Sequence, residues 1–356
     1  TRIVQPIELI KVDSDEALDI DNFTDLKVAE YLVGRKRILI RCDAAVNLGM
    51  GHVYRAAALA QELAEHSLSI VISADASLSA EFFSTQPFSV LTVNSDEEFI
   101  ELVARESADL VILDKLDSDR EYVQRLQRSG SKVVTFEDLG SGAEAADLLV
   151  SDLYANPRVP AERQLNGVTN SVLSPAFNST ISPITVRPEV ERVLVVFGGT
   201  DPAGLTLKAL QALSELKFSG EVLVVRGLGA PEVPALDSLG LRGEILFNVA
   251  HMPSLMQRAD LAISSAGRTI TELLSLGIPV ICLAQNAKET THTHASSEYG
   301  VTNLGLGSAV SVAELAKVVD STMAESVRRA QHDRALAATR GRSNAGVIAR
   351  ILKVLN

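Results

Sequence analysis

The chain has 356 residues, of which 46% are hydrophobic and 22% charged, so it is long enough for two domains with sizeable buried cores. Its net charge of −12, with no block of lysines and arginines, argues against nucleic acid and anionic membrane surfaces as partners. No uninterrupted apolar run approaches the roughly 18 residues of a membrane span. Cys42 and Cys282 fall in apolar, strand-like segments, which predicts reduced core residues of a cytoplasmic protein.

Residues 1–35 precede the regular pattern of the chain, and from residue 36 onward short apolar runs alternate with amphipathic helical patterns. Strands that are apolar on both faces and alternate with helices predict a parallel sheet covered on both sides. The predicted strands are 37–43, 68–75, 89–93, 109–114, 132–136 and 147–151, and the helices between them include 53–66, 95–107 and 118–130.

Residues 173–191 contain several prolines and little periodicity, which predicts a linker. A second alternation follows it, so the chain is predicted to be of the α/β class, with two Rossmann-like domains facing each other across a cleft. Ligands of such folds bind at the carboxyl ends of the strands. The predicted elements of this half are strands 192–197, 221–226, 244–247, 260–264 and 279–284 and a helix from about 203 to 217.

The sequence NLGMGHVYR connects the first predicted strand to the first predicted helix. Gly49 and Gly51 would let a ligand approach the backbone, and the free N–H groups of a first helical turn attract anions. The spacing is not the dinucleotide pattern G-x-G-x-x-G, because Arg55 stands near the third glycine position. Arg55 is counted, with Asp114, among the predicted nucleotide- or substrate-binding residues. The helix dipole favours a neutral imidazole, so we predict His52 as a general base, with Asp43 as the second catalytic candidate. The alternative is a tight turn with an exposed histidine.

Two loops of the second half have a similar composition. In VVFGGTDPAG, Gly198 and Gly199 are followed by Thr200 and Asp201 as predicted caps, and Pro202 is predicted at the first helical position. In SSAGRTITELL, small residues at a helix start predict a diphosphate site to which an arginine adds charge. Each loop alone could be a structural turn, and the two together are stronger evidence. The residues assigned to the second loop are Ser265, Ala266, Gly267 and Arg268, with Glu272 one turn later placed to accept bonds from two ribose hydroxyls.

His292 and His294 are separated by two positions, which places them on different faces of a helix, and no carboxylate or cysteine cluster accompanies them. We therefore predict no metal site and no cofactor. The chain also lacks a G-x-S-x-G elbow, which argues against covalent acyl chemistry.

These segments together resemble the UDP-sugar hydrolases of the pseudaminic-acid pathway, a family with the GT-B fold related to the glycosyltransferase that adds N-acetylglucosamine to the lipid-linked cell-wall precursor. The resemblance covers residues 37–310. It rests on motifs in family order, which are RCDAAVNLGMGHVYR, FEDLG, VVFGGTDP, NVAHMPSLMQRADLAISSAGRTITELLSLGIP and the spacing on to Gly300.

The resemblance implies that His52 is the catalytic residue, that the glycine pair and the Ser-Ala-Gly turn hold the UDP diphosphate, and that Glu272 binds the ribose. It also implies metal-free hydrolysis of a UDP-linked 2,4-diacetamido-trideoxyhexose in nonulosonic (pseudaminic or sialic-type) acid biosynthesis. This agrees with the chemistry, because a diphosphate is a good leaving group. The site needs only to place a water, remove its proton and hold the departing charge.

Two departures from the family pattern fall on the sugar side of the cleft. The Asp-x-Tyr expected after the fourth strand is reduced to Asp114, without the tyrosine, and Lys288-Glu289 stand where the family has Asn-Gln. The identity of the sugar therefore transfers less well than the nucleotide site.

Residues 17–33 resemble the closing segment of a cytidylyltransferase of the CMP-sialic-acid-synthetase type, without a CTP-binding loop. We therefore predict a cytidylyltransferase-like tail at 1–35, fused to or associated with such a domain. The other predicted domains are 36–180, with the catalytic loop, and 181–356, with the UDP site and a last helix that packs back on the first domain.

Two alternatives to hydrolysis stay open at this point. One is a GT-B glycosyltransferase that uses the same UDP-sugar donor and has an acceptor groove instead of a water site. The other is a non-catalytic nucleotide-sugar-binding module of a cytidylyltransferase fusion, which would have little reason to keep an imidazole in GMGHVYR.

Overall fold

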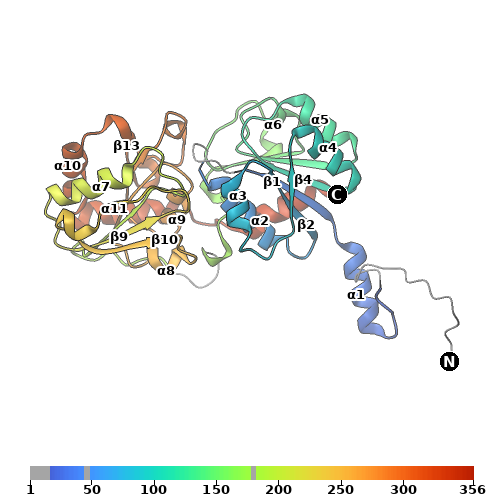
Figure 1. Cartoon of the computed structure of the whole chain (residues 1–356), viewed down its shortest axis with the longest axis horizontal. Coiled ribbons are helices and arrows are strands. Elements are labelled where there is room, and N and C mark those ends of the chain that lie inside the picture. Colours follow the sequence, from blue (N-terminus) through green and yellow to red (C-terminus); the bar gives the residue numbers. More distant parts are fainter. Residues whose placement is uncertain (1–16, 44–48, 178–181) are drawn as a thin grey trace.

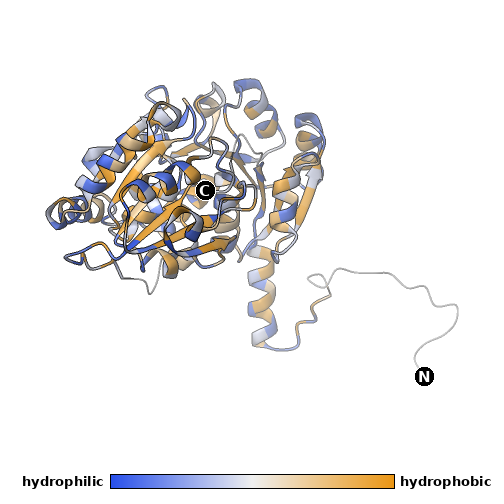
Figure 2. Cartoon of the chain, turned by 60° about the vertical axis from the view of Figure 1, so that its left-hand side comes forward, coloured by the Kyte–Doolittle hydropathy of each residue, from blue (hydrophilic) through white to orange (hydrophobic). Residues whose placement is uncertain are grey.

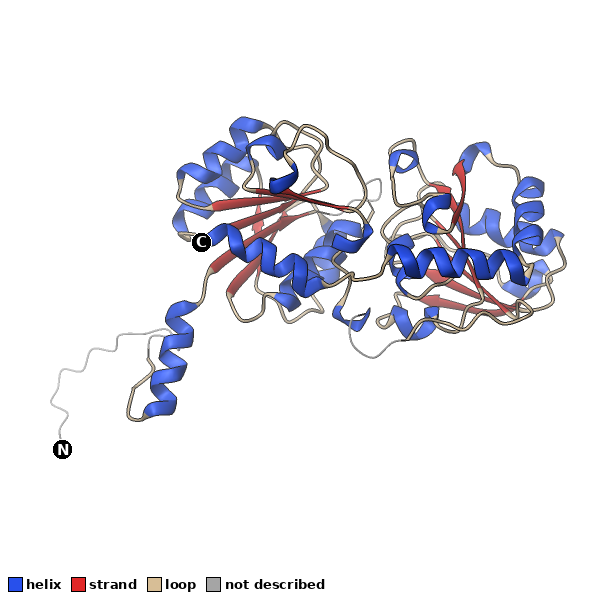
Figure 3. Ribbon diagram, turned by 180° about the vertical axis from the view of Figure 1, so that it is seen from behind, coloured by secondary structure: helices blue, strands red, loops and turns tan. Residues whose placement is uncertain are grey.

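The computed structural model describes residues 17–43, 49–177 and 182–356, and these form two α/β domains that lie next to each other (Figure 1). Each domain is built on one parallel sheet with helices around it (Figure 3). Part of the predicted tail (1–16), part of the glycine loop (44–48) and part of the predicted linker (178–181) lie outside the described residues.

The N-terminal sheet has seven parallel strands in the order β3-β2-β1-β4-β5-β6-β7. Side chains of β1 alternate between two cores, because Ile38 and Ile40 pack on one face of the sheet and Leu39 packs on the other. This two-sided burial confirms the parallel sheet predicted from the apolar runs. Its strands are β1 (Arg37–Cys42), β2 (Ser67–Ser73), β3 (Val90–Val93), β4 (Leu110–Asp114), β5 (Lys132–Phe136), β6 (Leu148–Ser151) and β7 (Gln164–Asn166).

Two helices of this domain begin at a residue whose side chain caps the first turn. Ser95 accepts a hydrogen bond from the backbone N–H of Glu98, and Asp119 accepts one from that of Tyr122. The short strand β7 and the helix α3, which has no side-chain cap, were not predicted. The helices are α2 (Gly51–Glu62), α3 (Ser77–Phe83), α4 (Asp96–Arg105), α5 (Arg120–Arg128) and α6 (Gly142–Ala145).

The C-terminal sheet has six parallel strands in the order β10-β9-β8-β11-β12-β13. Here too, Leu194 and Val196 face one core and Val193 and Val195 face the other. The strand β13 was not predicted, because polar and glycine residues interrupt it. The strands are β8 (Arg192–Val196), β9 (Glu221–Arg226), β10 (Arg242–Phe247), β11 (Leu261–Ser264), β12 (Val280–Ala284) and β13 (Val301–Leu306), with helices α7 (Leu205–Glu215), α8 (Met252–Met256), α9 (Thr269–Ser275), α10 (Val312–Thr322) and α11 (Glu325–Ala338).

The last helix, α12 (Asn344–Leu352), packs against the N-terminal domain, so the C-terminus lies beside that domain in Figure 1. Val347 and Ile351 of α12 are buried in the same core as Leu59 of α2. The Asn344 amide donates a hydrogen bond to Glu62 over 2.7 Å. The chain therefore crosses between the domains a second time after the linker.

The helix α1 (Phe23–Gly34) projects from the N-terminal domain and buries none of its residues (Figures 1 and 2). Its capping box, formed by Asn22 and Asp25, fixes its first turn. Phe23 and Val33 are 80% and 87% exposed, which is unusual for large apolar side chains. Among the helices of the described residues, none is both long enough and apolar enough to cross a membrane.

Candidate functional site between the domains

The candidate site lies where the strand order reverses in each sheet. In the first sheet this point is between β1 and β4; β4 ends at Asp114, and α2, which follows β1, carries His52 in its first turn. In the second sheet it is between β8 and β11, which lead into the Gly198-Gly199 loop and the Ser265 turn. Such switch points are the usual ligand sites of open α/β sheets.

His52 and Asp114 form a hydrogen-bonded pair, with Nδ1 of the imidazole 2.7 Å from Oδ1 of the carboxylate. The Asp114 side chain is fully buried, whereas that of His52 keeps 12% of its surface exposed. A carboxylate that accepts the Nδ1 proton leaves the lone pair of a neutral imidazole on Nε2. The backbone N–H groups at the start of α2 have no side-chain cap. This arrangement suits a general base.

Arg55 holds the buried side of Asp114. Its Nε and Nη2 donate to the two carboxylate oxygens over 2.6 and 2.5 Å, and its guanidinium lies 5.0 Å from the Phe136 ring centroid. Although burial acts to raise it, the pKa of Asp114 is held well below its usual range by the charges and hydrogen bonds of Arg55 and His52. Asp114 therefore stays ionised as the partner of His52.

The sequence-based roles of these two residues need correction. Arg55 is 1% exposed and Asp114 is fully buried, so neither is placed to contact a nucleotide or a sugar. In the sequence, an arginine near a helix start suggests an anion site. In the structure, the Arg55 guanidinium is already paired with the carboxyl groups of Asp114 and Glu137. The pairing of His52 with Asp114 was not predicted, and it arises because β4 lies next to β1, with Asp114 opposite Cys42.

The FEDLG motif supplies a second buried carboxylate, Glu137. It accepts hydrogen bonds from Arg55 Nη1 over 2.9 Å, from the Ser151 hydroxyl over 2.7 Å and from the backbone N–H groups of Asp152 and Leu153 over 3.2 Å. Its φ of 53° is a strained conformation for a residue with a side chain, so the surroundings hold it in place. Burial and the neighbouring Asp152 carboxylate raise the pKa of Glu137 to about 8.

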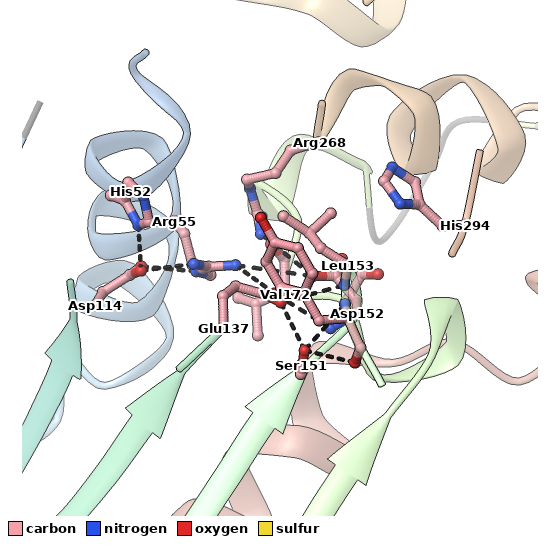
Figure 4. A network of polar contacts seen from close by, with 12 residues as sticks. His52, Arg55, Asp114, Glu137, Ser151, Asp152, Leu153, Val172, Arg268 and His294 are labelled. Carbon is pink, nitrogen blue, oxygen red and sulfur yellow. Dashed lines mark hydrogen bonds and ion pairs between the residues drawn. The ribbon is translucent and has the colours of Figure 1, made fainter. Parts of the chain in front are cut away.

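Arg268 enters this network from the C-terminal domain (Figure 4). Its Nη1 lies 3.8 Å from Asp152 Oδ1, and its Nη2 donates to the carbonyl of Val172. A Cβ on Gly51 would lie 3.1 Å from Arg268 Cδ, which shows how closely the two domains approach at this point. The structure thus places the Arg268 guanidinium against residues of the N-terminal domain. These residues, and not a diphosphate, are the partners that the fold itself gives to Arg268.

Asp43 has partners other than His52. Its carboxylate lies 2.7 Å from Arg41 Nη1 and accepts the backbone N–H of Ser73 over 2.7 Å. The structure thus pairs His52 with Asp114 and ties Asp43 to the neighbouring strand β2, which removes the geometric basis for its predicted catalytic role.

The glycine loop after β8 meets the glycine loop after β1. A Cβ on Gly199 would lie 2.3 Å from Cγ of Met50, so these loops are in direct contact across the domains. Thr200 is 3% exposed, and Gly198 has a φ of 73°, which favours glycine.

The N-cap position of α7 is Gly204, three residues after the predicted cap, but the Asp201 carboxylate still accepts the backbone N–H groups of Leu205 and Thr206. The helix begins at Leu205, so the prediction of Pro202 at its first position was wrong. These bonds also mean that the first N–H groups of α7 are already satisfied by a carboxylate.

The turn of Ser265, Ala266 and Gly267 is held by its own domain. The carboxylate of Glu289 accepts the backbone N–H of Gln285 over 2.8 Å, and burial raises its pKa against hydrogen bonds from Gln285 and Ala266. His292 and His294 contact the carbonyls of Ala266 and Gly267 at 2.7 and 3.0 Å. Glu289 was predicted on the sugar side of the cleft, and instead it lies beside the turn predicted to hold diphosphate.

The segment after β12 also contacts the N-terminal domain. His292 Nε2 lies 2.8 Å from the Tyr154 hydroxyl, and the backbone N–H of Thr293 donates to the carbonyl of Leu153 over 2.9 Å. Lys288 Nζ lies 3.6 Å from Asp117 Oδ2. In the described parts of the chain, no group of three histidine, cysteine, aspartate or glutamate side chains could hold a metal ion.

Glu272 is half-buried on α9. Burial raises its pKa to about 7, against the charge of Arg268. Within the residues that the structure describes, its carboxylate has no hydrogen bond or ion pair, which leaves both oxygens available to a ligand.

Comparison with known proteins gives matches in both sequence and structure. Residues 193–346 match the family model of the glycosyltransferase family 28 C-terminal domain. The uncharacterized protein MJ1062 of Methanocaldococcus jannaschii is 28% identical over 271 residues, which are 70% of this chain and 56% of that protein, so the chain spans little more than half of its length. The spore coat polysaccharide biosynthesis protein SpsG of Bacillus subtilis is 26% identical over 288 residues, 76% of this chain and 84% of that protein.

Solved structures share the whole architecture at low sequence identity. MurG of Acinetobacter baumannii has a TM-score of 0.62 at 15% identity, and covers 90% of this chain and 99% of its own. HepE of Anabaena, in complex with UDP and glucose, has a TM-score of 0.57 at 14% identity, with coverages of 90% and 99%. The calicheamicin glycosyltransferase CalG4 has a TM-score of 0.55 at 15% identity, with coverages of 90% and 98%. The chain therefore has the GT-B fold of two parallel-sheet α/β domains, and its residues 193–346 match the C-terminal domain of glycosyltransferase family 28.

Proposed function

We propose that this protein binds a UDP-sugar between its two domains and transfers the sugar to an acceptor hydroxyl, with His52 as general base. The observation that carries the proposal is the array of His52, Asp114 and Arg55 at the carboxyl ends of β1 and β4, on the side that meets the C-terminal domain. The match to a glycosyltransferase C-terminal domain supports transfer over the hydrolysis implied by the resemblance, since none of the relatives named above is described as a hydrolase.

The proposed reaction has one bond-forming and one bond-breaking event at the anomeric carbon. Nε2 of His52 takes the proton of the acceptor hydroxyl, the acceptor oxygen bonds to the anomeric carbon, and the bond from that carbon to the UDP oxygen breaks. Asp114, held by Arg55, keeps the imidazole oriented and stabilises the imidazolium that forms. The diphosphate leaves with its electron pair, so no covalent enzyme intermediate is needed.

Hydrolysis, with water in place of the acceptor, is the second candidate. It is supported by the resemblance of the motifs around His52 to UDP-sugar hydrolases, and the His52–Asp114 pair could take a proton from water as well as from an acceptor hydroxyl. The departures at Asp114 and Lys288-Glu289 leave the sugar unassigned. A 2,4-diacetamido-trideoxyhexose of nonulosonic acid biosynthesis stays a proposal that rests on the family resemblance alone.

A panel of UDP-sugars separates the two reactions. UDP release that needs an added acceptor, with a new glycoside visible by NMR, is expected if the protein is a transferase. UDP release at the same rate without acceptor, with free reducing sugar as product, would establish the hydrolase instead. A parallel arm with EDTA tests whether the reaction proceeds without a divalent cation, as the resemblance implies. Tight UDP-sugar binding without UDP release in any arm would contradict both.

We assign the ribose hydroxyls of UDP to Glu272. Glu272→Ala is expected to weaken UDP binding by roughly 1–3 kcal/mol, because two hydroxyls lose a charged acceptor. The pKa of about 7 means that Glu272 gains a proton as pH falls below neutrality, so UDP affinity should decrease from pH 8 to pH 6. Isothermal titration calorimetry at both pH values measures this, with Glu298→Ala, an exposed site on the same domain, as control. Equal UDP affinity in the Glu272→Ala variant would remove the assignment.

The cytidylyltransferase association is also retained as a proposal. It is supported by the exposure of Phe23, Tyr31 and Val33 on α1, a helix that buries none of its residues against the described part of this chain.

A further inference from the structure

We propose that Arg268 and Asp152 are positioning residues for His52, so that the approach of the C-terminal domain sets the charge of the network behind the catalytic imidazole. This inference rests on the proposed function of His52. It assigns to Arg268 a role across the domain boundary that differs from the direct diphosphate contact predicted from the sequence.

The geometry places Asp152 between two guanidinium groups from different domains. Its Oδ1 lies 3.7 Å from Nη1 of Arg55, on the N-terminal domain, and 3.8 Å from Nη1 of Arg268, on the C-terminal domain. Arg55 in turn binds Asp114, which binds Nδ1 of His52. Arg268 belongs to the C-terminal domain, so its interaction with Asp152 links the two domains (Figure 4).

The charges of the network explain why Arg268 matters. The carboxyl groups of Asp114, Glu137 and Asp152 are buried with the guanidinium of Arg55, and Arg268 supplies the second positive charge. Glu137, whose pKa is raised to about 8, keeps its proton at neutral pH, so the two guanidinium groups face two ionised carboxylates. Without Arg268, Arg55 alone would face both of them, and the excess negative charge would stabilise an imidazolium at His52. With Arg268 beside Asp152, Arg55 can pair fully with Asp114.

Charged and titratable groups from each neighbouring element lie in or beside this network. Asp114 of β4 contacts the imidazole, Arg55 comes from the same helix as His52, and Arg268 lies beside Gly51, the residue before His52. Tyr54 of that helix lies near Glu272, and His294 of the C-terminal domain faces Asp152. Glu137 and Asp152 follow β5 and β6. Because Arg268 and Asp152 carry opposite charges, their removal should act on His52 in opposite directions, and this distinguishes an electrostatic role from a merely structural one.

The test is an NMR titration of the His52 ring in protein with isotope-labelled histidine, assigned with a His52→Asn variant. Arg268→Gln leaves Asp152 without its second guanidinium, so the midpoint of the His52 titration should rise by about half a pH unit or more. Asp152→Asn is made in a Glu137→Gln background, because loss of Asp152 would otherwise let Glu137 ionise in its place. Compared with Glu137→Gln alone it removes a negative charge, so the midpoint should fall by a similar amount. Adding Arg268→Gln to this variant should return the midpoint close to that of Glu137→Gln alone.

Arg187→Gln, which removes an arginine paired with Asp260 on the same domain, is the matched control and should leave the midpoint unchanged. Midpoints that move in the same direction in both comparisons, or do not move, would overturn the proposal. Because each sign is expected independently, one folded variant is sufficient for a decision.

The titration needs no substrate, so it separates this proposal from the proposed function. Opposite shifts in a protein that releases no UDP would support the positioning role of Arg268 and Asp152 and contradict the proposed catalytic function. UDP release that depends on His52, without such shifts, would support the catalytic function and contradict the positioning role.

Discussion

His52→Asn is expected to lower the rate of UDP release by about 10²-fold or more while UDP binding remains nearly unchanged. The physical reason is that the imidazole removes a proton only as the new bond forms, and its Nδ1 is engaged by Asp114 within the protein. Asparagine retains a polar group of similar size and cannot take up the proton. Single-turnover kinetics with a UDP-sugar and calorimetry with UDP measure the two quantities separately.

His251→Asn is the control for this substitution, because His251 is exposed on the C-terminal domain. Its UDP release should match that of the unaltered protein. Undiminished release by the His52→Asn variant would exclude His52 as the base, and a parallel loss of UDP affinity would point to a binding role instead.

Arg55→Met is expected to lower the free energy of unfolding by about 3–5 kcal/mol at neutral pH, because it leaves the buried carboxylate of Asp114 without its cation and Glu137 without one of its hydrogen-bond donors. The methionine fills much of the same volume, so the loss arises mainly from uncompensated charge. Urea denaturation followed by circular dichroism gives the value.

The pH dependence of this loss has a definite sign. The pKa of Asp114 lies below its unfolded value, so its pairing stabilises the folded protein above about pH 4 and this contribution is lost as pH falls. The difference between Arg55→Met and the unaltered protein should therefore shrink in acid. Arg192→Met, at an exposed pair with Glu221, should cost much less. An equal loss in both variants would show that the buried network contributes no more than a surface ion pair.

The sequence by itself determined the two parallel sheets, because a strand covered on both faces is apolar at successive positions. Ile38, Leu39 and Ile40 show this, as they divide between two cores. It also placed His52 in the first turn of a helix after a glycine loop, since strand, glycines and amphipathic helix are local signals. The short β7 and the polar β13 gave no such signal, because their strand conformation depends on pairing with a neighbour.

Only the tertiary structure decided which charges meet. Asp114 is 62 positions from His52, and they touch because the order of the strands places β4 beside β1. Arg55 and Arg268 stand at or near helix starts, where sequence reasoning assigns a positive charge to an anionic ligand. In the folded chain these two arginines are instead paired with carboxyl groups that follow β5 and β6. Glu137 pairs with Arg55, and Asp152 lies beside Arg268. A local sequence pattern shows that an arginine stands near a helix start, but it does not show which group the arginine will bind. Its partner comes from a segment distant in the sequence. A buried guanidinium therefore pairs with the carboxyl groups that the fold brings next to it.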